Sequence, residues 1–300
     1  MNKLGVPLLA LVMQLLSIWA DPVRAQTLAR IQRSGQVSLG FLADQAPFSF
    51  QASDGKPGGY AVDLCGAVVD SLKARLQFPD LRAKYVHVTR ANGLDMVESG
   101  QVDVLCAAVP ETLKARERVS FSIPIYVGGL GVVVRADAPP ALKRVLNGEV
   151  ARTGPTWRAT INGGLQNRSY AVLAGSPAES LVRGRITTMG VIAKVVPVKT
   201  YDAGVGMLER GQVDALFGDR ATLTTLAVGR SQTELEVLDR RFTLDPAGLV
   251  IQRSDENFRL AVDAALSGLY RSGAVLTTYS RHFGEPTETA RLLFQAYGLP

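Results

Sequence analysis

Two stretches of this 300-residue chain resemble each other: TRANGLDMVESGQVDVL at residues 89–105 and TYDAGVGMLERGQVDAL at residues 200–216. The second begins 111 positions after the first, and nine of the 17 aligned residues are identical. A single pair at this separation is too few copies for a solenoid, which needs at least three stacked repeats. The duplication therefore indicates two similar lobes.

Each copy of the repeat reads as a short amphipathic helix that ends at a glycine, Gly100 or Gly211, and runs into an apolar strand. Upstream, residues 36–41 read as a strand, and residues 61–76 place apolar side chains on one helical stripe. Strands that alternate with helices in this way predict an α/β fold with largely parallel sheets covered on both faces.

The sequence outside the repeats suggests how the lobes are joined. Residues 128–134 and 247–252 are apolar, glycine-containing stretches that we interpret as strands crossing between the lobes. Residues 255–283 read as helical and are too short for a domain, so we expect them to return to the first lobe. The predicted organisation is a signal peptide over 1–25, lobe 1 over 26–127, lobe 2 with the crossovers over 128–245, the return segment over 246–284 and a tail over 285–300.

Composition excludes several classes of protein. Hydrophobic residues make up 47% and charged residues 20% of the chain, which is typical of a folded globular protein rather than a disordered or multi-span membrane protein. The net charge is +6, but no run of five basic residues forms a nucleic-acid track. His87 and His282 are distant in sequence, so a Cys/His zinc site is not expected. We therefore expect neither a nucleic-acid partner nor a metal or cofactor.

The N-terminus has the features of a signal peptide. Lys3 precedes an apolar run over residues 4–20, and Val23 and Ala25 put small residues where a signal peptidase reads. This pattern predicts cleavage before Gln26 and a periplasmic location. The alternative is an uncleaved anchor, although the apolar run is shorter than the ~20 residues that a bilayer core requires.

Six short motifs follow one another along the chain: APFSF at 46–50, GYAVDLC at 59–65, GQVDVLC at 100–106, VSFSIPIY at 119–126, VDALFGD at 213–219 and YSRHFG at 279–284. In order and spacing they resemble the periplasmic solute-binding proteins of polar amino-acid ABC importers, family 3, in the branch that includes glutamate/aspartate-binding proteins. The resemblance implies a type 2 periplasmic-binding fold, in which two α/β lobes joined by two crossover strands trap a small-molecule ligand in a cleft. It also implies a monomer that delivers the ligand to an ABC permease in the inner membrane.

The resemblance assigns ligand-binding roles to Asp219 and Arg116. Asp219 matches the family carboxylate that pairs with a ligand ammonium, and a charge-assisted hydrogen bond suits that role; the alternative is that it only caps the helix over 220–227. Arg116 is the nearest match to the family arginine that clamps a ligand carboxylate. An ungapped count places that arginine at Ala115, and a shift of one residue turns a helical side chain by ~100°. The alternative is therefore that Arg116 points to solvent.

Other positions depart from the family pattern. Pro110 stands where the family usually has Ser or Thr, Pro177 replaces a frequent threonine, and Leu42 stands where relatives with acidic ligands carry arginine. These departures weaken the expected grip on a ligand carboxylate. Arg90, after the first-lobe strand, is a candidate replacement cation, and a solvated surface arginine is the alternative.

Ser176 begins a capping box with Glu179, so its first interpretation is structural. The free N–H groups at the same helix start also attract anions, which makes Ser176 a candidate contact from lobe 2. The remaining candidates for ligand contact, all in lobe 1, are Thr112, Gln45, Phe48 and Tyr126. For Phe48, the alternative to ligand contact is a position in the core below the cleft.

Cys65 and Cys106 are both at positions that are cysteines in this branch of the family, which implies a disulfide. An exported protein meets oxidising conditions, under which the two can pair. Two buried free thiols are the alternative.

A binding protein is the leading functional hypothesis, and two others remain open. One is an enzyme on the same scaffold, like the periplasmic cyclohexadienyl dehydratases, with carboxylates as general acid and base. Glu179 or Glu111 would support it if either faced the cleft with a raised pKa. The other is a receptor that presents its closed form to a sensor.

Overall fold

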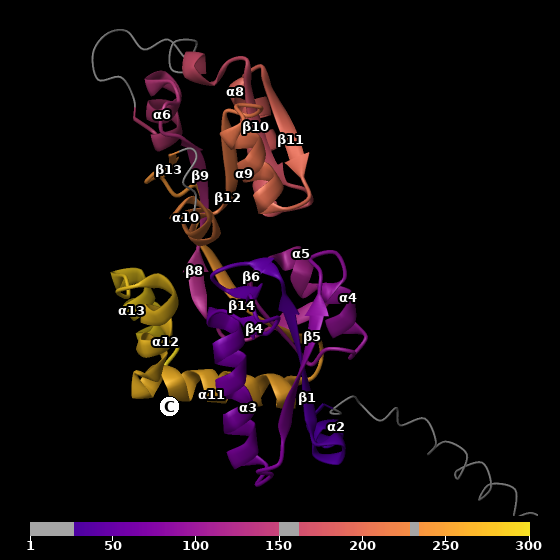
Figure 1. Cartoon of the computed structure of the whole chain (residues 1–300). Helices are drawn as coiled ribbons and strands as arrows, with labels where there is room; N and C mark the ends of the chain where they lie inside the picture. Colours follow the sequence, from indigo (N-terminus) through magenta and orange to yellow (C-terminus); the bar gives the residue numbers. More distant parts are fainter. Residues whose placement is uncertain (1–26, 150–161, 229–233) are drawn as a thin grey trace, which may run out of the picture.

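The computed structural model describes residues 27–149, 162–228 and 234–300. Its strands form two large sheets, each covered by helices on both faces, and a small third sheet. Figure 1 shows two bodies joined at a neck, with lobe 1 on the first sheet (lower) and lobe 2 on the second (upper). The predicted two-lobed α/β fold is confirmed. The predicted leader over 1–25 lies outside the described residues.

Lobe 1 is built on a sheet with strand order β5-β1-β6-β14-β7, and β8 pairs with β14. Strands β1, β5 and β6 are parallel, whereas β14 is antiparallel to β6, β7 and β8. The strands are β1 (Gln36–Leu42), β5 (Arg82–Val88), β6 (Val104–Pro110), β7 (Val119–Phe121), β8 (Tyr126–Gly128) and β14 (Asp245–Gln252), and the small sheet holds β2 (Asp44–Gln45), β3 (Ser49–Gln51) and β4 (Pro57–Gly58).

The helices of lobe 1 bury apolar side chains on both faces of this sheet. The helix over 61–76 is confirmed as α3 (Tyr60–Arg75), and its apolar stripe packs with the return helices in the larger core. The predicted tail also packs there, through Leu293 and Phe294. That face carries α2 (Thr27–Ser34), α3, α11 (Glu256–Ser272), α12 (Ala274–Phe283) and α13 (Glu288–Ala296); the other carries α4 (Gly93–Glu98) and α5 (Leu113–Arg116).

Lobe 2 is built on a sheet with strand order β11-β10-β12-β9-β13, in which β10, β11 and β12 are parallel. Helices α6 and α8 cover one face, and α9 and α10 cover the other. The elements are β9 (Leu130–Arg135), α6 (Pro140–Asn147), the 3₁₀ helix η1 (Asn162–Leu165), β10 (Arg168–Leu173), α8 (Pro177–Met189), β11 (Ala193–Val198), α9 (Tyr201–Glu209), β12 (Ala215–Asp219), α10 (Arg220–Val228) and β13 (Leu235–Val237).

The two copies of the sequence repeat have the same structure in the two lobes. Each is a helix followed by a central strand, α4 then β6 in lobe 1 and α9 then β12 in lobe 2. In lobe 1, Asp103 N–H donates to the Ser38 carbonyl at 2.8 Å and its carboxylate accepts from Ser38 N–H at 2.7 Å. In lobe 2, Asp214 makes the same pair of bonds with Ser169, both at 2.8 Å. The repeated aspartate therefore links equivalent pairs of neighbouring strands, β1 and β6 in lobe 1 and β10 and β12 in lobe 2.

The chain crosses between the lobes twice. It leaves lobe 1 between β8 and β9 and returns between β13 and β14. The two crossings touch each other: Leu130 N–H donates to Thr243 Oγ1 at 3.0 Å, and Phe242 N–H donates to the Leu130 carbonyl at 2.8 Å. A Cβ on Gly129 would lie 2.2 Å from the Thr243 carbonyl oxygen, so this close approach requires glycine.

Replacement of Gly129 by alanine is expected to lower the free energy of unfolding by about 1–3 kcal/mol, because the added methyl group must push the two crossings apart. The measurement is urea unfolding of the variant beside the wild type. Gly268→Ala is the matched control, because its Cβ would meet no atom within 4 Å. In the interior of α11 it should raise stability by up to about 1 kcal/mol. Equal unfolding midpoints for Gly129→Ala and the wild type would contradict the proposed close contact.

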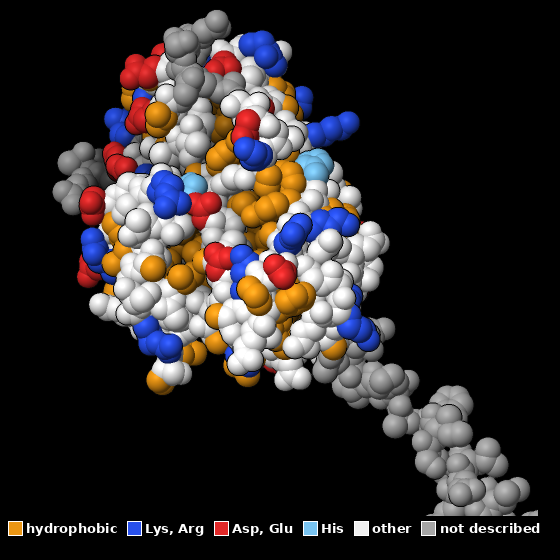
Figure 2. Space-filling view, turned by 60° about the horizontal axis from the view of Figure 1, so that its bottom comes forward, with side chains coloured by type: hydrophobic (Ala, Val, Ile, Leu, Met, Phe, Trp, Pro, Cys, Tyr) orange, Lys and Arg blue, Asp and Glu red, His pale blue; other side chains and the backbone are white. Residues whose placement is uncertain are grey.

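The surface of the molecule carries charges of both signs. On the face drawn in Figure 2, Lys and Arg side chains are interspersed with Asp and Glu side chains and form no continuous basic track. Over the described ranges, no helix combines the length and the apolar character needed to cross a membrane.

Candidate functional site

The carboxyl-terminal ends of the parallel strands in the two lobes face each other. In open α/β sheets, ligands bind outside these ends. On lobe 1, the ends of β1, β5 and β6 lead to Asp44, Arg90 and Glu111; on lobe 2, β11 and β12 lead to Tyr201 and Asp219. We call these two sets the facing edges, and they lie on either side of the neck in Figure 1.

One contact joins the facing edges directly. The guanidinium carbon of Arg90 lies 5.5 Å from the centre of the Tyr201 ring, within the range of a cation–π interaction. The Arg90 Nη2 atom also lies 3.4 Å from Asp44 Oδ1, and the Arg90 side chain is 30% exposed. Arg90 is therefore held between the two lobes and is not a freely solvated surface arginine.

Tyr201 is a residue of this site that the sequence analysis missed. The signal for it was present in the repeat, because Tyr201 occupies the same position in the second copy as Arg90 does in the first. Equivalent positions of the duplicated segment thus meet across the lobes. Gly218 makes room for the ring, since a Cβ there would lie 2.3 Å from a Tyr201 ring carbon. The Tyr201 hydroxyl accepts a hydrogen bond from Asp219 N–H at 3.2 Å.

Asp219 is the last residue of β12 and caps α10. Its Oδ1 atom accepts from Thr222 N–H at 2.9 Å and from Thr222 Oγ1 at 3.0 Å. The side chain is only partly exposed, and this burial raises the pKa of Asp219. Within the described residues, no Lys, Arg or His lies within ion-pair distance of it. The capping role is present, and ligand contact remains a prediction.

The second carboxylate oxygen of Asp219 faces the first crossing. A Cβ on Gly128 would lie 3.2 Å from Asp219 Oδ2. Tyr126, two residues earlier on β8, is close enough that burial and the negative charge of Asp219 raise the pKa of Tyr126. The structure therefore places Asp219 beside both Tyr126 and the neck.

Arg116 does not extend as a free cation at the facing edges. Its Nη2 atom lies 2.6 Å from Glu111 Oε1, and its side chain is 57% exposed. Thr112 is also exposed, and its Oγ1 atom accepts from Ala115 N–H at 3.1 Å, which caps α5. In this structure, both residues make local contacts within or next to α5.

Ser176 has the structural role that its capping box predicts. Its hydroxyl donates to the Leu173 carbonyl at 2.6 Å and accepts from Glu179 N–H at 3.4 Å. The Glu179 carboxylate accepts from Gly175 N–H at 2.8 Å. The Ser176 side chain lies at the carboxyl end of β10, on the facing edge of lobe 2. Its hydroxyl proton is already donated to the Leu173 carbonyl.

Gln45 and Phe48 lie below the facing edge of lobe 1. Gln45 is 7% exposed, and its Nε2 atom donates to the Ala108 carbonyl at 3.0 Å, while its Oε1 atom has no partner among the described residues. Phe48 is 1% exposed and packs against the rings of Tyr126 and Phe283. Phe48 is thus a core aromatic and not part of a ligand-contacting wall, which corrects its place among the candidates.

The predicted disulfide is present. Cys65 on α3 is bonded to Cys106 on β6, with the two Cα atoms 6.0 Å apart. Both residues are fully buried in the larger core of lobe 1. Among the described residues, no group of three or more His, Cys, Asp or Glu side chains could hold a metal ion.

Comparison with known proteins agrees with this architecture. Residues 37–285 match the family model of bacterial extracellular solute-binding proteins, family 3. The L-glutamate/L-aspartate-binding protein of Pseudomonas aeruginosa is 26% identical over 281 residues, which cover 92% of this chain and 86% of that protein. The glutamate/aspartate import solute-binding protein of Escherichia coli is 21% identical over 268 residues, covering 89% and 82%.

Solved structures share the fold. An ancestral amino acid-binding protein, a precursor of cyclohexadienyl dehydratase, matches with a TM-score of 0.70 at 21% identity and covers 86% of this chain and 99% of that one. The solute receptor for L-cysteine of Neisseria gonorrhoeae matches with a TM-score of 0.68 at 21% identity, covering 85% and 93%. On the strength of the family match, which spans most of its length, this chain belongs to family 3 of the bacterial extracellular solute-binding proteins.

Proposed function

We propose that this solute-binding protein captures a small amine-bearing, amino-acid-like metabolite in the periplasm and passes it to an ABC permease. The observation that carries the proposal is Asp219, a partly buried carboxylate at the facing edges with no cation partner among the described residues. A partly buried carboxylate that has hydrogen bonds but no cation within ion-pair distance is costly to keep charged, and a ligand ammonium would offset that cost.

The charges at the facing edges support a ligand that carries a positive group. Arg90 is paired with Asp44, and Arg116 is paired with Glu111. These two pairs are neutral overall, which leaves the Asp219 carboxylate as the unpaired charge among these five side chains. An ammonium–carboxylate hydrogen bond would strengthen as the closing lobes exclude water.

The same pairs argue against an acidic amino acid. A ligand carboxylate needs a guanidinium with free donors, and Arg116 is turned to Glu111. Arg90 already has partners, because it lies beside Asp44 and over the Tyr201 ring. Its positive charge also lowers the pKa of Asp219, against the larger effect of burial. The proposed ligand class is therefore a neutral amino acid or an amine, although the two relatives above are named for glutamate and aspartate.

Closure of the lobes would supply the rest of the mechanism. A ligand shifts the equilibrium toward the closed form only through contacts that this form alone provides. The touching crossings act as the hinge in this proposal, and the Arg90–Tyr201 contact is one that closure would tighten. The proposed lobes keep the predicted boundaries, with 26–127 and 246–284 in lobe 1 and 128–245 in lobe 2.

Export and delivery complete the proposal. The leader over 1–25 would be removed, so that the mature protein is free in the periplasm and works as a monomer. The relatives include an import solute-binding protein and a putative amino-acid ABC transporter-binding protein, which supports a permease as the partner.

A thermal-shift screen tests the ligand class. L-glutamine, L-arginine and putrescine represent neutral and cationic amines, and L-glutamate represents acidic amino acids. A true ligand at a hundredfold above its Kd should add about 2.7 kcal/mol of stability. The matched control is the best ligand with every primary amine acetylated, such as an N-acetyl amino acid or N,N′-diacetylputrescine, because it lacks the ammonium and should give no shift. Strong stabilisation by L-glutamate alone would overturn the proposed class.

The enzyme alternative receives no support from its two candidate carboxylates. A general acid needs a raised pKa. Gly175 N–H and the Arg183 guanidinium instead lower the pKa of Glu179. Glu111 is paired with Arg116 at 2.6 Å. The relatives named above are binding proteins.

A further inference from the structure

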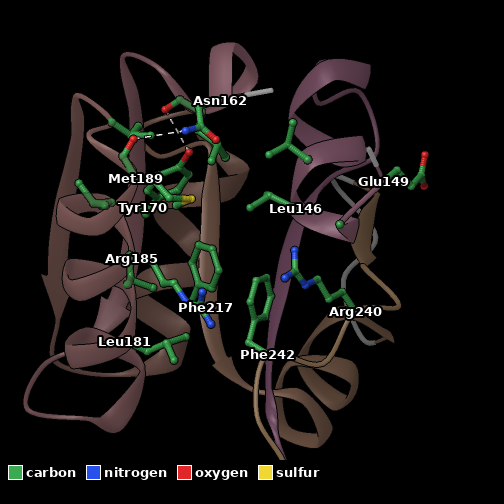
Figure 3. A pocket seen from close by; sticks show the side chains of 16 residues that line it. Leu146, Glu149, Asn162, Tyr170, Leu181, Arg185, Met189, Phe217, Arg240 and Phe242 are labelled. Atoms are coloured by element: carbon green, nitrogen blue, oxygen red, sulfur yellow. Dashed lines mark hydrogen bonds between the residues drawn. The ribbon is translucent and has the colours of Figure 1, made fainter. Parts of the chain in front are cut away.

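Lobe 2 contains a cavity that is separate from the facing edges. It has a volume of about 280 Å³ and lies between α6 and α8, over the sheet face that these helices cover. Figure 3 shows Leu146 of α6 on one wall and Leu181 of α8 on the other, with Phe217 and Phe242 between them. None of the candidate ligand-binding residues lines it.

The inner wall of this cavity is apolar, and its polar groups are already bonded. The Tyr170 hydroxyl donates to the Leu165 carbonyl at 3.3 Å. Asn162 Nδ2 donates to the Met189 carbonyl at 3.3 Å. Burial raises the pKa of Tyr170 further above neutrality, so its hydroxyl stays protonated. The wall therefore offers an occupant mainly dispersion contacts and removal of apolar surface from water.

Two guanidinium groups extend toward this apolar space from opposite sides. In Figure 3, Arg185 reaches toward Phe217, and Arg240 reaches in from the other wall above Phe242. The Arg240 guanidinium carbon lies 4.9 Å from the centre of the Phe242 ring, which holds it in place. A Cβ on Gly148 would lie 3.0 Å from Arg240 Nη1, so the glycine that ends α6 leaves room for this side chain.

Neither arginine is neutralised within the described residues. Arg183 on the same helix pairs with Glu179, but no described carboxylate lies within ion-pair distance of Arg185 or Arg240. Glu149 also borders the cavity, and Figure 3 shows its carboxylate pointing away from the space. A guanidinium has donors and no acceptor. The polar end of an occupant must therefore be an acceptor, and its negative charge would match the two cations.

We infer that this cavity binds a small single-chain amphipathic carboxylate, a free fatty acid of medium length. The carboxylate would sit between Arg185 and Arg240, and the chain would lie against Leu146, Leu181 and Phe217. The cavity volume is close to the lower end of the ~300–1,000 Å³ found for ligand sites, which suits one short chain and not a two-chain lipid. This is a second ligand site, independent of the one proposed at the facing edges.

Isothermal titration with sodium decanoate tests the inference on the full exported protein. Binding by decanoate is expected, with decanol at least tenfold weaker because it lacks the charge. The double variant Arg185→Gln/Arg240→Gln should weaken decanoate binding at least tenfold. The matched control, Lys194→Gln/Arg210→Gln, removes the same charge from lobe 2 away from the cavity and should leave the affinity unchanged.

Methionine methyl NMR locates the bound probe. Met189 lines the cavity, whereas Met207 lies on α9 on the opposite sheet face and Met96 lies in lobe 1. Decanoate is expected to shift the Met189 methyl signal only. It should do so equally in Asp219→Asn, so that this test stands apart from the proposed function.

Two results would overturn the inference. One is the absence of decanoate binding, and the other is equal binding of decanoate and decanol.

Discussion

Asp219→Asn is expected to weaken binding of the ligand at the facing edges by about a hundredfold or more, which corresponds to ~2.7 kcal/mol or above. Asparagine keeps the size of the side chain and an oxygen that can accept from Thr222 N–H and Oγ1, so α10 remains capped. Only the charge is lost. Titration calorimetry with the best compound from the screen measures the change.

The unliganded variant should be no less stable than the wild type. Burial raises the pKa of Asp219 above its unfolded value. A carboxyl group with a raised pKa contributes stability below its unfolded pKa and loses that contribution as the pH rises through its folded pKa. At neutral pH the charged form therefore disfavours folding, and a neutral asparagine should melt at or above the wild-type temperature. A lower melting temperature would show that the cap was damaged.

Ligand binding should also depend on pH through the same group. As the pH falls through the raised pKa of Asp219, the carboxyl group becomes protonated and the affinity for an ammonium ligand should fall. Asp219→Asn should remove this dependence. Asp239→Asn is the matched control, because Asp239 is a fully exposed carboxylate of lobe 2 that lies 3.7 Å from Arg220. It should leave both the affinity and its pH dependence unchanged, and an equal loss in the two variants would contradict a specific role for Asp219.

Local features of this protein could be predicted from its sequence because they depend on neighbouring residues. The repeated helix and strand, with Asp103 and Asp214 at equivalent places, required only a comparison of two segments. The capping box at Ser176 depends on a spacing of three residues, and the structure has the predicted bond from Glu179 N–H to the Ser176 hydroxyl. The Glu179 carboxylate accepts from Gly175 N–H and not from Ser176 N–H, so the second bond of the box is displaced by one residue. In such cases the pattern and the contact lie within one element.

Contacts between elements could not be predicted in the same way. The direction of Arg116 depends on Glu111, which lies five residues away across the start of α5, and resemblance to the family gives no information about that pair. The meeting of Arg90 and Tyr201 depends on how the two lobes face each other. The repeat alignment put these residues at equivalent positions, but only the arrangement of the lobes shows that equivalent positions touch. The cavity between α6 and α8 likewise has no pattern in the sequence, because its lining comes from separate elements.

Removal of the disulfide is expected to have the largest effect on stability. The Cys65–Cys106 bond closes a loop with a sequence separation of 41 residues. On the chain-entropy model, a loop of this length stabilises the folded state by about 4 kcal/mol. The double variant Cys65→Ala/Cys106→Ala should lower the free energy of unfolding by this amount. Alanine is preferred to serine because both sites are fully buried, and serine hydroxyls would lack partners there.

The loss should be confined to lobe 1, because α3 and β6 both belong to its larger core. Urea unfolding followed by methionine methyl NMR separates the lobes, with Met96 reporting on lobe 1 and Met189 and Met207 on lobe 2. The Met96 transition should move to lower urea in the double variant, while the other two stay near their wild-type midpoints. A common shift of all three signals would mean that the two lobes unfold as one cooperative unit. An unchanged Met96 midpoint would mean that the bond adds no stability. Because both cysteines are fully buried, a reducing agent without urea should leave the bond intact and the wild-type spectrum unchanged.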